Sequence, residues 1–105
     1  MSIWFVSRHP GAIAWVKSQP ISVDKFCEHL DTSMIQSGDT VIGNLPVPMG
    51  AEIIAKGARY IYLSISVPSE LRGQELSETD LTRLGVSLHD VKITLGESLD
   101  AVEIN

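Results

Sequence analysis

The sequence is poor in cysteine and in basic side chains. Cys27 is the single cysteine, so no disulfide can form within the chain and no zinc site can be built from cysteine thiolates. Lysine and arginine number 8 against 13 aspartates and glutamates, and this net charge of −5 argues against a protein that coats long nucleic acid. A small anionic ligand stays open, because one or two arginines and backbone N–H groups can bind it.

Long apolar runs and the common nucleotide-binding motifs are also missing. No stretch approaches the roughly 20 apolar residues of a membrane span, and the opening apolar run has no basic flank, so neither a membrane helix nor a signal peptide is predicted. The glycine patterns that bind dinucleotides or nucleoside triphosphates are absent, and no two histidines stand at helical metal-ligand spacing beside a carboxylate. We therefore expect a cytoplasmic protein with no cofactor, no metal site and no membrane contact.

What is present is typical of one small globular domain. The chain has 105 residues, of which 44% are hydrophobic and 20% charged, so we assign one domain to residues 1–105. The acidic end, residues 96–105, is expected to be loosely held.

The opening stretch, IWFVSRHPGA, organises the prediction. Its apolar residues Ile3–Val6 predict a buried strand, and Pro10 begins an apolar pattern at helical spacing that should extend to Gln19 before Pro20. The loop between them therefore lies at the carboxyl end of a strand and at a helix N-terminus. In open α/β sheets this edge is where ligands bind.

The next segment, Ile21 to Leu30, is ambiguous. Its apolar residues fit a helical stripe, which favours a helix starting at Ser22, while its β-branched start and short length also suit an edge strand. A loop over Asp31 to Gly38 follows.

The middle of the chain predicts a β-α-β unit. A buried strand from Thr40 ends at Gly43 and Asn44, a helix opened by Pro46 and Pro48 ends at Gly57, and Arg59 to Val67 form a second strand. Strands joined in this way are parallel with a right-handed crossover. With the opening strand and helix, the unit predicts the α/β class: a small Rossmann-like, mostly parallel sheet flanked by helices.

The last third continues this pattern with a turn, a helix and a strand. The turn is expected at Arg72 and Gly73. Ser77 with Asp80 three residues later resembles a capping box for a helix that ends at Gly85. Alternation at Val91, Ile93 and Leu95 predicts a final strand, which could be antiparallel.

If the sheet is parallel, polar residues from three strands converge at one edge. Ser7, Arg8 and His9 follow the first strand, Gly43 and Asn44 end another, and Ser64 approaches from a third. His9 is the natural acid or base of this loop near neutral pH. The alternative is that Arg8 and His9 form a solvated turn. His29 and His89 are expected to be surface or capping residues.

A second candidate anion contact is Arg72. Gly73 beside it permits close approach of a ligand, and Glu75 could orient a hydroxyl or an arginine. The alternative is a loop salt bridge, which contributes little.

Four segments together resemble a small family of CRISPR-associated Csx-type proteins encoded beside type III systems. They are FVSRHPGA from Phe5, GDTVIGNLPV from Gly38, GARYIYLS from Gly57 and LRGQELS from Leu71, and the likeness spans about Ile3 to Leu84. The resemblance implies a CARF-like variant of the fold and a ring nuclease. Such an enzyme cuts cyclic tetra-adenylate, a cyclic oligoadenylate second messenger, and switches the antiviral signal off.

The resemblance also implies roles for the polar residues. Arg8 would stabilise charge on the phosphoryl oxygens, His9 would transfer a proton, and Ser7 would help to position phosphate or ribose. The predicted ligand-binding residues are Pro10, Gly11, Gly43, Asn44, Leu45, Ser64, Arg72, Gly73 and Glu75.

A ring with repeated symmetry suits a two-fold homodimer whose pocket straddles the interface. Two other functions stay open on the sequence. The protein could bind and sequester cyclic oligoadenylate without cutting it, or it could be an accessory that docks on another CRISPR component.

Overall fold

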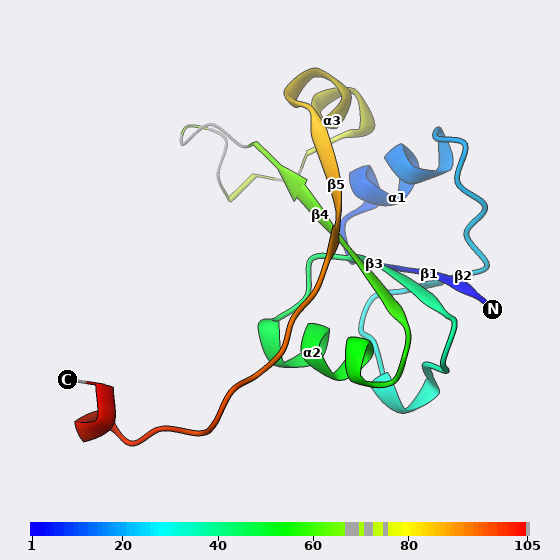
Figure 1. The fold of residues 1–105 in the computed structure, drawn as a ribbon. Helices are drawn as coiled ribbons and strands as arrows, with labels where there is room; N and C mark the ends of the chain where they lie inside the picture. Colours follow the sequence, from blue (N-terminus) through cyan, green and yellow to red (C-terminus); the bar gives the residue numbers. More distant parts are fainter. Residues whose placement is uncertain (67–69, 71–72, 75, 105) are drawn as a thin grey trace.

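The computed structural model describes residues 1–66, 70, 73–74 and 76–104. Within them, helices and strands alternate along most of the chain (Figure 1). In chain order they are β1 (Ile3–Val6), α1 (Pro10–Lys17), β2 (Lys25–Cys27), the 3-10 turn η1 (Thr32–Met34), β3 (Thr40–Gly43), α2 (Val47–Ala55), β4 (Arg59–Ile65), α3 (Glu78–Leu84), β5 (Val86–Val91) and the 3-10 turn η3 (Ala101–Ile104).

The strands form one mixed sheet in the order β2-β1-β3-β4-β5. The first four strands are parallel, and β5 runs antiparallel to β4 at the edge. Helices α1 and α3 lie together on one face of the sheet and α2 lies on the other (Figure 1). This three-layer arrangement confirms the predicted small Rossmann-like fold.

Side-chain alternation along the strands divides the core between the two faces. On β1, Phe5 points toward α1, whereas Trp4 and Val6 point toward α2. The α2 face buries Trp4, Val6, Ile35, Val41, Ile53, Ala58 and Tyr60. The α1 and α3 face buries Phe5, Ala12, Trp15, Val16, Ile42, Leu63 and Leu81.

The strand order reverses between β1 and β3. From β1 the chain passes through α1 to β2 on one side, and from β3 it passes through α2 to β4 on the other side. The two connections therefore leave adjacent strand ends toward opposite faces of the sheet. Such a topological switch point opens a crevice beyond the carboxyl ends of the strands.

The second segment is an edge strand, so the predicted helix from Ser22 is wrong. Lys25–Cys27 pair in parallel with β1, and the Asp24 N–H donates to the Ile3 carbonyl at 2.8 Å. The free edge of β1 needs a hydrogen-bonding partner, and this tertiary pairing overrides the helical spacing of the apolar residues.

The final strand is antiparallel, as the sequence allowed, but it ends at Val91, so the predicted strand residues Ile93 and Leu95 lie beyond it. β5 starts at Val86, because Gly85 with φ of 90° reverses the chain directly after α3. Its pairing with β4 runs from Ile65↔Val86 to Tyr60↔Val91. Most β5 side chains are exposed, so the sequence shows little alternation that would mark the strand.

Helix ends follow local hydrogen-bonding rules. The predicted capping box is confirmed, since Ser77 Oγ accepts from the Asp80 N–H at 3.1 Å and Asp80 Oδ2 accepts from the Ser77 N–H at 3.0 Å. Gly57, with φ of 84°, follows α2, as predicted. Helix α1 ends two residues before Gln19, because a residue that precedes proline disfavours the helical conformation.

β4 spans Arg59–Ile65, and the predicted end of this strand, Val67, lies outside the described residues. The predicted site residues Arg72 and Glu75 lie outside the described residues.

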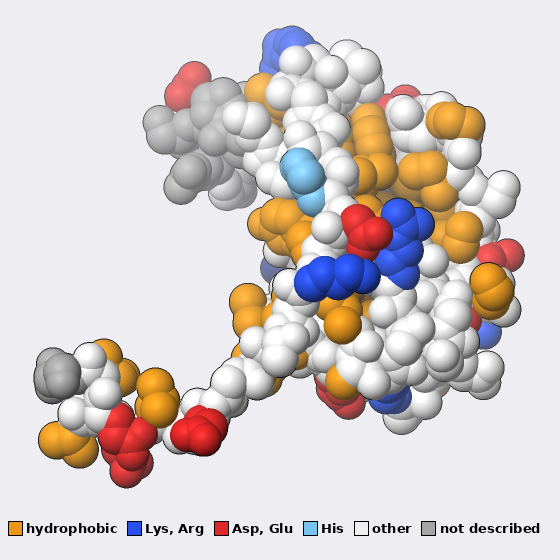
Figure 2. Space-filling model, in the orientation of Figure 1, with side chains coloured by type: hydrophobic (Ala, Val, Ile, Leu, Met, Phe, Trp, Pro, Cys, Tyr) orange, Lys and Arg blue, Asp and Glu red, His pale blue; other side chains and the backbone are white. Residues whose placement is uncertain are grey.

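The C-terminal segment runs away from the sheet (Figures 1 and 2). Residues 92–100 have no regular structure, although Ile93 still packs against the α2 face of the core. Further along, Leu99, Val102 and Ile104 are exposed.

At the edge of the sheet opposite the crevice, the buried carboxylate of Asp39 accepts hydrogen bonds from three N–H groups. It accepts hydrogen bonds from the Ser2 N–H at 2.9 Å, the Gln36 N–H at 3.0 Å and the Trp4 indole N–H at 3.3 Å. The N–H groups of Ser2 and Gln36 hold the pKa of the Asp39 carboxyl below its usual value. The ionised form therefore ties the start of β1 to the start of β3.

Replacing Asp39 by asparagine should lower the free energy of unfolding at pH 7 by about 2–3 kcal/mol, because the new amide group faces N–H donors. Urea denaturation measures this loss. The folded-state pKa of Asp39 lies below its unfolded value, so its contribution is present above the unfolded pKa and is lost as the pH falls through the folded pKa.

The difference between wild type and Asp39→Asn should therefore shrink as the pH falls through the acid range. Asp100→Asn removes the same charge from an exposed position and should change stability by less than about 0.5 kcal/mol. Equal stability of wild type and Asp39→Asn at pH 7 would contradict the role of this carboxylate.

Candidate functional site

A pocket of about 740 Å³ lies at the carboxyl edge of the sheet, where the topology predicts a crevice. Its size falls within the usual range for small-molecule sites. The lining residues come from the strand ends, the loops that follow them, the segment that leads into α3, and helices α1, α2 and α3. They are Phe5, Val6, Ser7, Arg8, His9, Ala12, Glu28, His29, Leu30, Gly43, Asn44, Leu45, Pro46, Met49, Leu63, Ile65, Gln74, Leu76 and Leu81.

The loop after β1 is held by its own backbone and by β2. The Ser7 N–H donates to the Cys27 carbonyl at 3.0 Å, which extends the β1–β2 ladder by one bond. The Ser7 hydroxyl accepts from the His9 N–H at 3.1 Å, and this bond turns the chain toward α1. Arg8 and His9 are exposed at the pocket lining, where a ligand can reach them.

The buried side chain of Tyr60 fixes the loop after β3 through two hydrogen bonds. The Tyr60 hydroxyl accepts from the Leu45 N–H at 2.8 Å and donates to the Gly43 carbonyl at 3.3 Å. Burial raises the pKa of this hydroxyl, so it stays protonated and keeps both bonds. The chain from Gly43 to Leu45 is therefore fixed before any ligand arrives.

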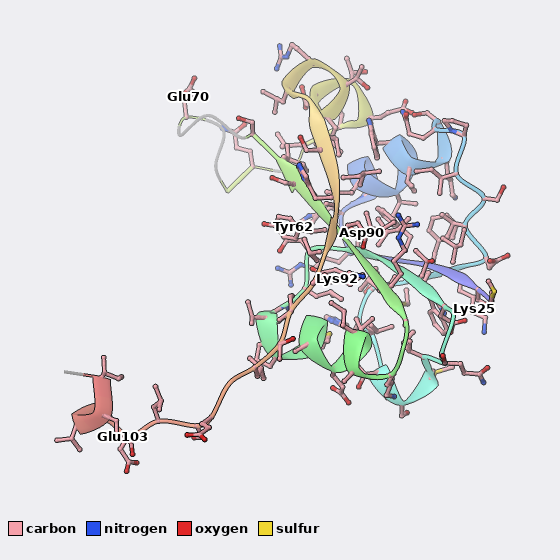
Figure 3. The ribbon with its side chains drawn as sticks, in the orientation of Figure 1. Lys25, Tyr62, Glu70, Asp90, Lys92 and Glu103 are labelled. Atoms are coloured by element: carbon pink, nitrogen blue, oxygen red, sulfur yellow. The ribbon has the colours of Figure 1, made fainter. Side chains whose placement is uncertain are left out.

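Asn44 is directed toward β4. Its Nδ2 lies 3.4 Å from both the Tyr62 hydroxyl and the Leu63 carbonyl. Tyr62 itself lies on β4 near the middle of the molecule, whereas Glu103 lies at the far end of the C-terminal segment (Figure 3). Of the described residues, none beyond Leu81 lines the pocket, so the C-terminal segment takes no part in it.

The pocket combines an apolar floor with a polar rim. Phe5, Leu63 and Leu81 form part of the floor. The rim carries a guanidinium, two imidazoles, a carboxylate, a hydroxyl and an amide, from Arg8, His9, His29, Glu28, Ser7 and Asn44. Helices α1 and α2 both begin at this edge, and helix N-termini favour negative charge. The arrangement suits a ligand with a flat or apolar part and an anionic part.

The structure brings most of the predicted residues together. Those that line the pocket are Ser7, Arg8, His9, Gly43, Asn44 and Leu45. The predicted residues Pro10, Gly11, Ser64 and Gly73 do not line it. Ser64 points to the other face of the sheet from Leu63 and Ile65, because side chains alternate along β4.

Gly11 has a packing role. A Cβ at this position would lie 1.9 Å from the Leu76 carbonyl oxygen, so glycine lets α1 pack closely against the segment before α3. Since Leu76 lines the pocket, Gly11 supports that wall from behind.

Among the described residues, no three side chains of His, Cys, Asp or Glu are grouped so that they could hold a metal ion. The helices in the same part of the chain are too short to cross a bilayer.

The chain was compared with known proteins. Residues 4–94 match the model of a family described as "Putative CRISPR-associated protein (Cas_VVA1548)". The chain belongs to this family. No curated protein and no solved structure matches it. The family match extends from β1 through β5, so it includes every segment that forms the pocket of this CRISPR-associated protein.

The sequence missed the wall of the pocket that follows β2. Glu28, His29 and Leu30 line the pocket, although His29 was expected to be a surface or capping residue. The available signal was the short edge-strand alternative for this segment. A strand ending at Cys27 would have placed Glu28 and His29 at the same edge as Arg8 and His9.

Tyr60→Phe keeps the buried ring and removes the hydroxyl that joins Gly43 to Leu45. We expect a loss of about 1–2 kcal/mol in the free energy of unfolding, because the Leu45 N–H and the Gly43 carbonyl lose their partner. The amide signals of Asn44 and Leu45 in NMR spectra should also broaden or shift.

Tyr62→Phe is the matched control. Within the described residues, its hydroxyl makes a single hydrogen bond, the 3.4 Å contact from Asn44, so the same change there should have the smaller effect on stability. A Tyr60→Phe protein as stable as wild type, with an unchanged Leu45 amide, would refute the positioning of this loop by Tyr60.

Proposed function

We propose that this CRISPR-associated protein is a ring nuclease that cuts cyclic tetra-adenylate without a metal ion, and so ends type III CRISPR signalling. The observation that carries the proposal is the polar rim of the switch-point pocket. There a guanidinium, an imidazole, a hydroxyl and an amide surround one opening in a chain of a CRISPR-associated family. An apolar floor beneath them suits an adenine base.

The reaction needs no external nucleophile. A ribose 2′-oxygen of the ring attacks the adjacent phosphorus while the bond from phosphorus to the 5′-oxygen breaks. The 2′-hydroxyl loses a proton and the departing 5′-oxygen gains one, which leaves a 2′,3′-cyclic phosphate and a 5′-hydroxyl. The protein must hold these atoms in line, stabilise the charge on the phosphoryl oxygens and move the protons.

The rim residues match these tasks. Arg8 stabilises the negative charge of the phosphoryl group in the transition state, and His9 transfers a proton. Ser7 and Asn44 position phosphate or ribose, and the backbone N–H groups at the start of α1 and α2 add to the anion-binding field.

The proposal is tested by incubating the purified protein with cyclic tetra-adenylate in excess chelator and resolving the products by chromatography and mass. We expect linear fragments that end in a cyclic phosphate. Arg8→Ala should slow cleavage about 100-fold or more, the usual effect of losing one group that stabilises transition-state charge.

Arg83→Ala is the control for Arg8→Ala. Arg83 lies on α3, does not line the pocket, and pairs with Asp80 at 3.4 Å in an exposed position, so its loss should leave the rate unchanged. An intact ring would refute the nuclease. Tight binding of that intact ring would then indicate a sequestering module, and no binding would favour an accessory that docks on another CRISPR component.

A two-fold homodimer would place two copies of the pocket around the symmetric ring. In sedimentation velocity with cyclic tetra-adenylate present, we expect a species of twice the 11.5 kDa chain mass. A monomeric mass at high protein concentration, both with and without the ring, would contradict the shared pocket.

A further inference from the structure

The loops that follow the neighbouring strands β1 and β2 each bring a histidine to the same pocket. Strands β1 and β2 pair in register up to Val6↔Cys27, and the Ser7 N–H continues the ladder to the Cys27 carbonyl. Neighbouring strands lie about 4.8 Å apart. The segments that follow these strand ends therefore leave the sheet side by side.

Each of the two segments carries an imidazole directly after a charged side chain. Arg8 and His9 follow β1, and Glu28 and His29 follow β2. All four side chains are on exposed residues and all four line the pocket. His29 is thus the second imidazole available to a ligand in that pocket.

We propose that His29 is a catalytic residue, the partner of His9 in a pair that carries the two proton transfers of ring cleavage. This inference rests on the proposed function. One imidazole accepts the proton of the attacking 2′-hydroxyl as the bond from the 2′-oxygen to phosphorus forms. The other, as imidazolium, donates its proton to the 5′-oxygen as the bond from phosphorus to that oxygen breaks.

Two proton-transfer groups would explain why two adjacent loops of the pocket each carry a histidine. The attacking and leaving oxygens lie on opposite sides of the phosphorus in an in-line displacement, so a single side chain cannot easily reach both. Loops from two neighbouring strands can reach a phosphoryl group from two directions, while Arg8 contacts its equatorial oxygens.

In the part of the chain that the structure describes, the other charged side chains that line the pocket are those of Arg8 and Glu28. Among the described residues, the lining contributed by the β3–α2 loop, by β4 and by the region from Gln74 to Leu81 carries no ionisable side chain.

The test measures the single-turnover rate of cyclic tetra-adenylate cleavage against pH for wild type, His29→Gln and His89→Gln. Wild type should show a bell-shaped profile, because one imidazole must be neutral and the other protonated. His29→Gln should cut at least 100-fold more slowly and should lose one limb of the profile, while the dissociation constant for the ring changes less than about threefold.

His89→Gln is the matched control, because His89 lies on β5 and does not line the pocket. It should keep the wild-type rate and profile. Cleavage by wild type together with a His29→Gln rate within threefold of wild type would overturn the role of His29 alone, as would a slower rate with both limbs kept. An intact ring with wild type would overturn this role and the nuclease together.

Discussion

Parallel pairing of β1 with β3 is the constraint on which the rest of the structure depends. The two strands are in register from Ile3↔Thr40 to Val6↔Gly43, so their carboxyl ends meet at one edge. Gly43 allows this approach, since a Cβ there would lie 2.9 Å from the Val6 carbonyl oxygen. Because α1 and α2 leave these ends toward opposite faces, the edge stays open, and the pocket follows from the topology.

Buried polar groups stabilise this pairing at both ends of the sheet. At the amino edge the Asp39 carboxylate binds Ser2, Gln36 and Trp4, and at the carboxyl edge the Tyr60 hydroxyl holds the loop from Gly43 to Leu45. Hydrogen bonds of this kind are costly to lose, because each would leave a buried donor or acceptor without a partner. The backbone that carries the exposed side chains of the pocket is therefore held rigidly, as the proposed positioning of a phosphodiester would require.

The parts of the fold that the sequence predicted are those whose signal is local. Buried apolar runs mark β1, β3 and β4, and the capping box of α3 depends on residues three apart in the chain. The edge strands β2 and β5 are short or largely exposed, so their identity depends on pairing with a distant strand. The same difficulty explains which parts of the pocket could be predicted from the sequence. The pocket walls that follow β1 and β3 were predicted. The wall with Glu28 and His29 was missed, because the segment that forms β2 was interpreted as a helix.

We propose that cyclic tetra-adenylate binds at the switch point between β1 and β3. The most direct measurement is an NMR titration with an analogue whose 2′-hydroxyls are methylated and which therefore cannot be cut. This proposal predicts changes in the amide chemical shifts of Ser7 to His9, Glu28 to Leu30 and Asn44 to Leu45. The amide shifts of Gly38, Asp39 and Gly57, at the opposite edge of the sheet, should stay unchanged. Shifts confined to that opposite edge, or no shifts at saturating analogue, would contradict it.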